Sequence, residues 1–245
     1  MKIVSSMKMA EVVHLNYHLL PIISRFGIHL GFGERTIEQL CTEYEIDVNF
    51  FLVILNSCHD KNYFPRKHLQ GFSLKLIIEY LRKSHQYYLN IKIPRIDQLL
   101  QQLLIQASGL GGDSLKLIDR FFKEYKIELA SHLGREEEKV YPYVFTIEEA
   151  FQSHIMSREL VSRIYEYSID DYENEHDNME DKLCDLQNII IKYLPIPLDM
   201  NLCHMILMEL FRLESDLNDH ARIEDKVLVP KVRYMEKWII DHFNS

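Results

Sequence analysis

The sequence has few residues that break or cross-link a chain. Its 245 residues include only 8 glycines, 7 prolines and 4 cysteines, whereas 47% of them are hydrophobic. So little glycine and proline excludes a largely disordered chain and favours long helices. The cysteines form no CxxC pair, which excludes a compact disulfide framework and is typical of a reducing compartment. They are Cys41, Cys58, Cys184 and Cys203.

Long apolar runs and an excess of basic charge are also missing. No 18 consecutive residues are apolar, and Lys8, Glu11 and His14 interrupt the first apolar stretch. We therefore expect neither a membrane span nor a signal peptide, and we predict a cytoplasmic protein. The formal net charge is −9, and residues 69–245 hold the whole acidic excess. Neither nucleic acid nor an anionic membrane is expected as a partner of such an acidic body.

The apolar spacing is helical throughout, without the alternation that strands require. Within residues 1–70, Thr36 to Gln39 forms a capping box that starts a short helix. A helix-turn-helix that reads DNA is disfavoured here, because the second helix, at residues 48–55, offers no Lys or Arg to phosphates. The sequence predicts an all-α fold, with a small helical module at 1–70 followed by an up-down four-helix bundle at 71–245.

Prolines divide the predicted bundle into helices. We expect the second and the last long helices to end at Pro142 and Pro230, because proline breaks the hydrogen-bond pattern of an α-helix. Residues 146–193 have a helical pattern with one weak point at 168–172.

One segment of the bundle occurs twice, 88 residues apart. ELASHLGREE at 128–137 and DLNDHARIED at 216–225 share an acid, a Leu, a His, a Glu and a second acid, and each is followed by a proline. A single His and Glu four residues apart are usually neighbours on a helix surface. Six matching positions in both copies are hard to attribute to chance. Residues i and i+4 share a helix face, so each His–Glu pair can reach one ion.

Two further histidines, His85 and His176, precede the two copies. The intervals between the four histidines are 47, 44 and 44 residues, which places one on each helix at a similar depth in an up-down bundle. Buried charge without a partner is costly, and metal coordination is a reason to bury these groups together. The predicted ligands are His85, His132, Glu136, His176, His220 and Glu224.

This ligand set predicts two metal ions. Four imidazoles and two carboxylates are too many for one four-coordinate zinc ion. They suit two ions about 3.5–4 Å apart, each with two histidines, and with Glu136 and Glu224 as bridges. The donor types favour iron over the alternatives manganese and zinc. We therefore predict two iron ions with an oxo- or hydroxo-bridge, and expect Glu128 and Asp216 to support the ligands or to line an access path.

These motifs resemble the haemerythrin-type di-iron bundles, in particular the repair-of-iron-centres family of iron–sulfur cluster repair proteins. The resemblance covers nearly the whole chain, including Ile93-Pro94, both repeats, Glu175-His176-Asp177 and the Pro195 turn before Cys203. It implies the same six ligands and a role in repairing iron–sulfur clusters damaged by nitrosative or oxidative stress. It also implies damaged iron–sulfur proteins as partners, oxygen or nitric oxide as small ligands, and a homodimer through the small module.

The sequence departs from these families at two places. Oxygen-carrying haemerythrins usually have a second histidine where this chain has Glu180, which argues against a plain oxygen carrier. The small module has Gly31 and Phe32 where the family has two adjacent cysteines, and Cys41 is expected in the core, so no thiol chemistry is expected there.

The alternative function is binding or sensing of oxygen or nitric oxide by a haemerythrin-like protein. A helical interaction protein with a vestigial site is disfavoured by the ligand set. No residue is assigned as catalytic, and whether the protein is an enzyme stays open.

Overall fold

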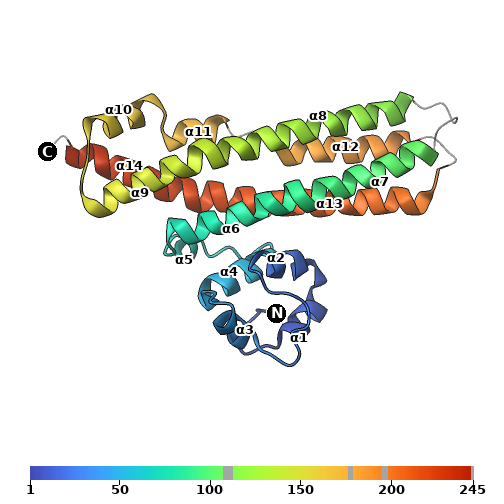
Figure 1. The fold of residues 1–245 in the computed structure, drawn as a ribbon, viewed down its shortest axis with the longest axis horizontal. Helices are drawn as coiled ribbons and strands as arrows, with labels where there is room; N and C mark the ends of the chain where they lie inside the picture. Colours follow the sequence, from blue (N-terminus) through green and yellow to red (C-terminus); the bar gives the residue numbers. More distant parts are fainter. Residues whose placement is uncertain (107–112, 176–178, 195–197, 244–245) are drawn as a thin grey trace. The chain divides into compact units, whose positions relative to one another are not determined.

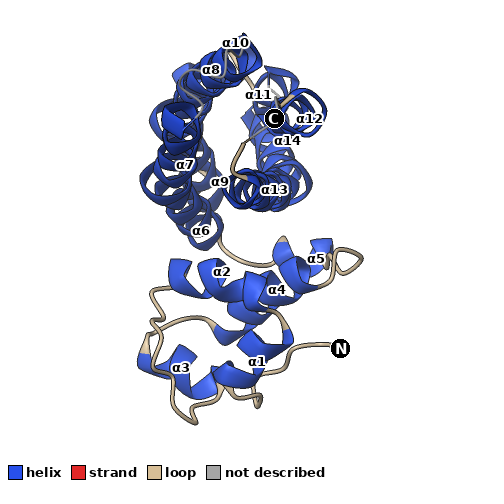
Figure 2. Cartoon of the chain, turned by 90° about the vertical axis from the view of Figure 1, so that its right-hand side faces the viewer, coloured by secondary structure: helices blue, strands red, loops and turns tan. Residues whose placement is uncertain are grey.

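The computed structural model describes residues 1–106, 113–175, 179–194 and 198–243. In these ranges the regular structure is helical, apart from one isolated bridge between Lys8 and Thr36 (Figure 2). The predicted all-α fold is confirmed. The chain forms two compact units, residues 1–83 and 84–245. None of the helices in the described ranges has the length and apolar composition that a bilayer span requires.

Short helices make up the first unit. They are α1 (Met9–Leu15), the 3-10 turn η1 (Tyr17–Leu19), α2 (Leu20–Arg25), α3 (Ile37–Glu43), α4 (Val48–His59) and α5 (Arg66–Leu69), followed by the start of α6 (Leu74–Tyr87). The capping box is confirmed, since the Thr36 hydroxyl accepts from the Gln39 backbone N–H and the Gln39 side chain accepts from that of Thr36. Cys41 is buried in the core, and burial raises the pKa of its thiol to about 12.

Long helical rods form the bundle (Figure 1). The first joins α6, the π-helical segment η2 (Tyr88–Lys92) and α7 (Ile93–Gln106); the second joins α8 (Asp113–Arg135), η3 (Glu136–Val140) and α9 (Tyr141–Ser153). The third consists of α10 (Arg158–Glu166), α11 (Ile169–Glu175) and α12 (Met179–Tyr193). The fourth joins α13 (Met200–Ile223), η4 (Glu224–Leu228) and α14 (Val229–Phe243).

The packing order of the helices is that of an up-down bundle. α7 packs against α8 and α13, and α12 packs against the same two helices. The four therefore surround one core, which includes Leu100, Leu129, Leu186 and Leu213. Burying each such leucine contributes about 1.5–3 kcal/mol relative to leaving it exposed. Beyond α8 and α13, the rods continue as α9 and α14, which pack against each other.

The prediction that helices end at Pro142 and Pro230 is wrong, because both helices continue past these residues. A π-helical segment precedes each proline, and the backbone N–H of Tyr141 donates to the carbonyl of Glu136 five residues earlier, as that of Val229 does to Glu224. Proline lacks an N–H, and its ring presses on the carbonyl four residues earlier in an α-helix. We attribute the continuity of the rods to the wider π turn, which accommodates the ring. η2 precedes Pro94 in the same way.

The stretch 146–193 contains more breaks than its sequence pattern predicts. α9 ends at Ser153, His154 takes a left-handed conformation with φ of 56°, and Ser157 caps α10. At the weak point predicted at 168–172, the helix is interrupted at Tyr167 and Ser168 and resumes at Ile169. The third rod, which consists of α10, α11 and α12, is therefore divided into shorter helices, whereas the other three rods are continuous.

Candidate metal centre

Five of the predicted ligands lie in the interior of the bundle, in or shortly before a π segment. His85, His132 and His220 lie in the last turns of α6, α8 and α13. Glu136 and Glu224 are the first residues of η3 and η4 and are completely buried. The three histidines are also buried. A carboxylate at 0% exposure needs strong compensation, so the surroundings of the two glutamates decide what this region can do.

Four of these side chains converge on one point. One ligand atom from each of His85, Glu136, His220 and Glu224 lies within 4.8 Å of all the others. His85 Nε2 is 3.1 Å from Glu136 Oε2 and 3.2 Å from His220 Nε2, and His220 Nε2 is 3.4 Å from Glu224 Oε1. Two imidazole nitrogens and two carboxylate oxygens at these separations form a donor set that fits a metal cation.

Glu136 connects this cluster to a second histidine. Its Oε2 faces His85, whereas its Oε1 is 3.0 Å from His132 Nε2. One oxygen atom is therefore directed to each imidazole, which is the arrangement a carboxylate needs to bridge two ions. His176 lies outside the described residues, as do the side chains of Glu175 and Glu180. The role of all six residues as ligands stays a prediction.

Glu137 is a supporting residue that sequence reasoning missed. Its Oε1 lies 2.8 Å from His85 Nδ1, the ring nitrogen opposite the one that faces the cluster. A carboxylate at this position fixes the orientation of an imidazole and raises its basicity as a ligand. Burial lowers the pKa of His85, but hydrogen bonds to Glu136 and Glu137 raise it to about 9. Consecutive residues on a helix face different directions, so no local pattern predicts that both Glu136 and Glu137 contact His85.

We expect Glu137→Ala to lower metal affinity about 10- to 100-fold without changing the number of ions bound, because the ligands themselves remain. Glu138→Ala is the matched control, since Glu138 is the next residue of the same π segment and is exposed. Competition titration with a chelator measures both variants. Equal affinities for the two would show that the Glu137–His85 contact does not support metal binding.

Each of the two glutamates accepts a hydrogen bond from a buried tyrosine. Tyr172 OH donates to Glu136 Oε1 at 2.7 Å, and Tyr141 OH donates to Glu224 Oε1 at 3.1 Å. Burial and the nearby carboxylates raise the pKa of both phenols far above its usual value, so both remain protonated donors. Tyr141 follows Glu136 by five residues, and its backbone bond across the π turn brings it into the centre.

The acids one turn before the repeated histidines have different roles. Asp216 Oδ1 accepts from Tyr88 OH at 3.2 Å, and the Tyr88 ring meets the His220 ring edge-on. Asp216 therefore supports a candidate ligand through Tyr88. Glu128 instead pairs with Lys182 on the surface at 2.8 Å, outside the centre.

The comparison with protein families agrees with this geometry. A family model described as the Hemerythrin HHE cation binding domain matches residues 76–232, which is more than half of the chain and contains all six predicted ligands. No curated protein matches the sequence.

Proposed function

Because the chain belongs to the haemerythrin family of HHE cation-binding proteins, we propose that it is a di-iron protein that helps repair iron–sulfur clusters damaged by nitrosative or oxidative stress. The observation that carries the metal part of this proposal is the position of Glu136, with one oxygen atom facing His85 and the other facing His132. His220 and Glu224 complete the described donor set, and His176 is its proposed sixth member.

The surrounding residues suit the task of holding such a centre. Iron held by these residues would supply redox chemistry and affinity for a small molecule such as oxygen or nitric oxide. Glu136 and Glu224 neutralise the positive charge, and Tyr172 and Tyr141 fix the orientation of the two carboxylates. Glu137 fixes the ring of His85. Because these groups lie among buried side chains, their electrostatic interactions are stronger than they are in water.

The repair function is supported by the motifs that this sequence shares with the repair-of-iron-centres proteins. Glu180, at the place of the additional histidine of oxygen carriers, argues against simple oxygen transport. Damaged iron–sulfur proteins are the proposed partners, and nitric oxide or oxygen are the proposed small ligands. Sensing of these gases is the competing outcome of the experiment below.

We expect the iron-loaded protein to restore activity to a dehydratase whose iron–sulfur cluster has been damaged by nitric oxide. The metal-free wild-type protein serves as the control, because it keeps the whole chain but lacks the proposed iron. Recovery of dehydratase activity is measured under anaerobic conditions. If the wild-type protein changes its visible spectrum with nitric oxide but restores no activity, the sensing function replaces repair.

A further inference from the structure

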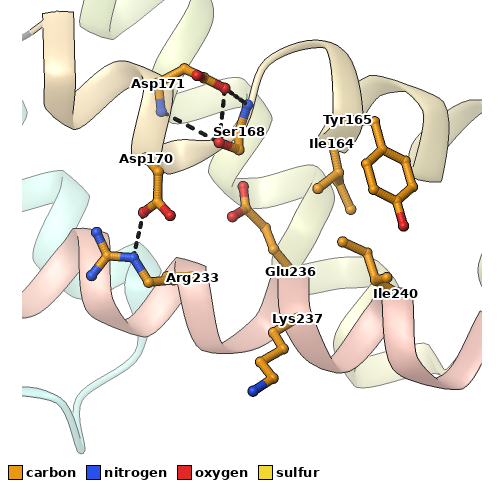
Figure 3. A pocket seen from close by; sticks show the side chains of 9 residues that line it. All are labelled: Ile164, Tyr165, Ser168, Asp170, Asp171, Arg233, Glu236, Lys237 and Ile240. Atoms are coloured by element: carbon orange, nitrogen blue, oxygen red, sulfur yellow. Dashed lines mark hydrogen bonds and ion pairs between the residues drawn. The ribbon is translucent and has the colours of Figure 1, made fainter.

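A buried carboxylate outside the metal centre anchors the short helix α11. Glu236 on α14 is only 4% exposed, and its Oε1 accepts from the backbone N–H of Ile169 at 2.9 Å and from the hydroxyl of Tyr143 on α9. Figure 3 shows this carboxylate extending from α14 towards the segment where α11 begins. Burial raises the pKa of Glu236, whereas the two hydrogen bonds act in the opposite direction. This side chain therefore ties α9, α11 and α14 together.

Other ties between α11 and α14 are more exposed. Arg233 pairs with Asp170 and Glu173, but these side chains are 38–52% exposed, and pairs of this kind contribute little to stability. Asp171 hydrogen-bonds Ser168 within its own segment, so it does not fix α11 to another rod. Glu236 is thus a buried polar tie between the start of α11 and α14.

The position of α11 matters because this helix carries Tyr172. α11 has seven residues, too few for a helix that is stable on its own, so its position depends on packing and anchoring contacts. Tyr172 lies three residues after the anchored Ile169 and is 1% exposed. Its hydroxyl reaches Glu136 at 2.7 Å. A shift of α11 would change this hydrogen bond directly.

An open surface pocket lies beside Glu236, next to the start of α11. It has a volume of about 510 Å³ and is bordered by Ile164 on α10, by Ser168 and Asp170 at the start of α11, and by Ile240 on α14 (Figure 3). A tightly packed surrounding would hold α11 even without its anchor. On this side α11 is open to solvent, so its position depends on its buried contacts with α14, among them those of Glu236.

We propose that Glu236, with Tyr143 as its donor, is a positioning residue of the metal centre: it holds α11 so that Tyr172 donates to Glu136. Its role in metal retention rests on the proposed function, whereas its hold on α11 does not. Without this anchor every proposed ligand is still present, but the hydrogen bond from Tyr172 that orients the carboxylate of Glu136 is weakened.

The test begins with the metal-free protein. Glu236→Ala should raise amide hydrogen exchange in residues 169–175 by about tenfold or more, because it removes the buried acceptor of the Ile169 N–H. Tyr143→Phe should raise the exchange as well, because Glu236 then loses the donor that holds its carboxylate in place. In protein labelled with ¹³C-tyrosine, the ring signal of Tyr172 should shift in both variants; Tyr172→Phe assigns this signal. Lys237→Ala is the control, since Lys237 borders the same cavity but is exposed. Glu236→Gln keeps an oxygen acceptor and should remain close to wild type.

The second arm follows transfer of Fe(II) from the loaded protein to a colorimetric chelator. Glu236→Ala and Tyr172→Phe should each accelerate transfer by about tenfold, and the double variant should be little faster than Tyr172→Phe alone, because both changes remove one interaction. The logarithm of the rate increase caused by Glu236→Ala is compared in the wild-type and the Tyr172→Phe backgrounds. If more than half of it remains in the Tyr172→Phe background, the proposal is overturned. Unchanged hydrogen exchange and an unchanged Tyr172 signal in the metal-free variants would also overturn it.

Should Glu236→Ala fail to fold, Tyr143→Phe decides in its place. Wild-type protein that binds no iron would contradict the proposed function, and the metal-free arm would still decide whether Glu236 positions Tyr172.

Discussion

Alanine at Glu136 or at Glu224 is expected to remove at least about half of the bound metal, because each carboxylate is proposed to bridge both ions and to shield their charges from each other. The substitution of Glu136 is also expected to lower the stability of the folded protein. Glu136 contacts His85, His132 and Tyr172, and removing it leaves these buried groups without a shared acceptor. Breaking a buried network of this kind lowers the free energy of unfolding by about 3–5 kcal/mol.

Glu138→Ala and Lys226→Ala are the matched controls for the two substitutions. Both residues lie in the same π segments as the glutamates but are exposed, so we expect wild-type metal content and stability. Metal analysis and urea unfolding provide the two measurements. Similar losses in all four variants would mean that the repeated HxxxE segments form a helix-surface pattern, and the bridging assignment would have to be abandoned.

Removing the metal from the wild-type protein is expected to lower its thermal midpoint by roughly 10 °C. A ligand at about 1,000 times its dissociation constant stabilises the folded state by about 4 kcal/mol, which corresponds to roughly 8–16 °C for a chain of this size. The physical reason is that the metal compensates Glu136 and Glu224, which are completely buried.

The same comparison in the Glu136→Ala variant serves as its control. This variant should show a much smaller difference between chelator-treated and metal-loaded samples in differential scanning calorimetry. A wild-type midpoint that does not respond to the chelator would indicate that the buried cluster is stable by itself, through an imidazolium at His85 paired with Glu136 and Glu137.

The repeat predicted where the site lies because helical periodicity is a local property. His132 with Glu136, and His220 with Glu224, are four residues apart, so any helix places each pair on one face. The regular intervals between histidines brought His85 to the same depth. The all-α fold followed from the same periodicity. His176 lies outside the described residues, so its place in the site stays a prediction.

The parts that could not be predicted depend on contacts between rods. Tyr172 reaches Glu136 from α11, a helix whose start is hydrogen-bonded to α14, and no local pattern in the sequence encodes either contact. The continuation of the helices past Pro142 and Pro230 was also hidden, because proline usually ends a helix. A signal was nevertheless present: both prolines follow the buried glutamates by six residues, which leaves room for one π segment in each case.

Metal analysis of the purified protein, reconstituted anaerobically with iron, tests the central claim most directly. The account predicts two iron ions per chain and, after oxidation, the near-ultraviolet absorption of an oxo- or hydroxo-bridged pair. One ion per chain, or selective retention of zinc after reconstitution with iron, would contradict it.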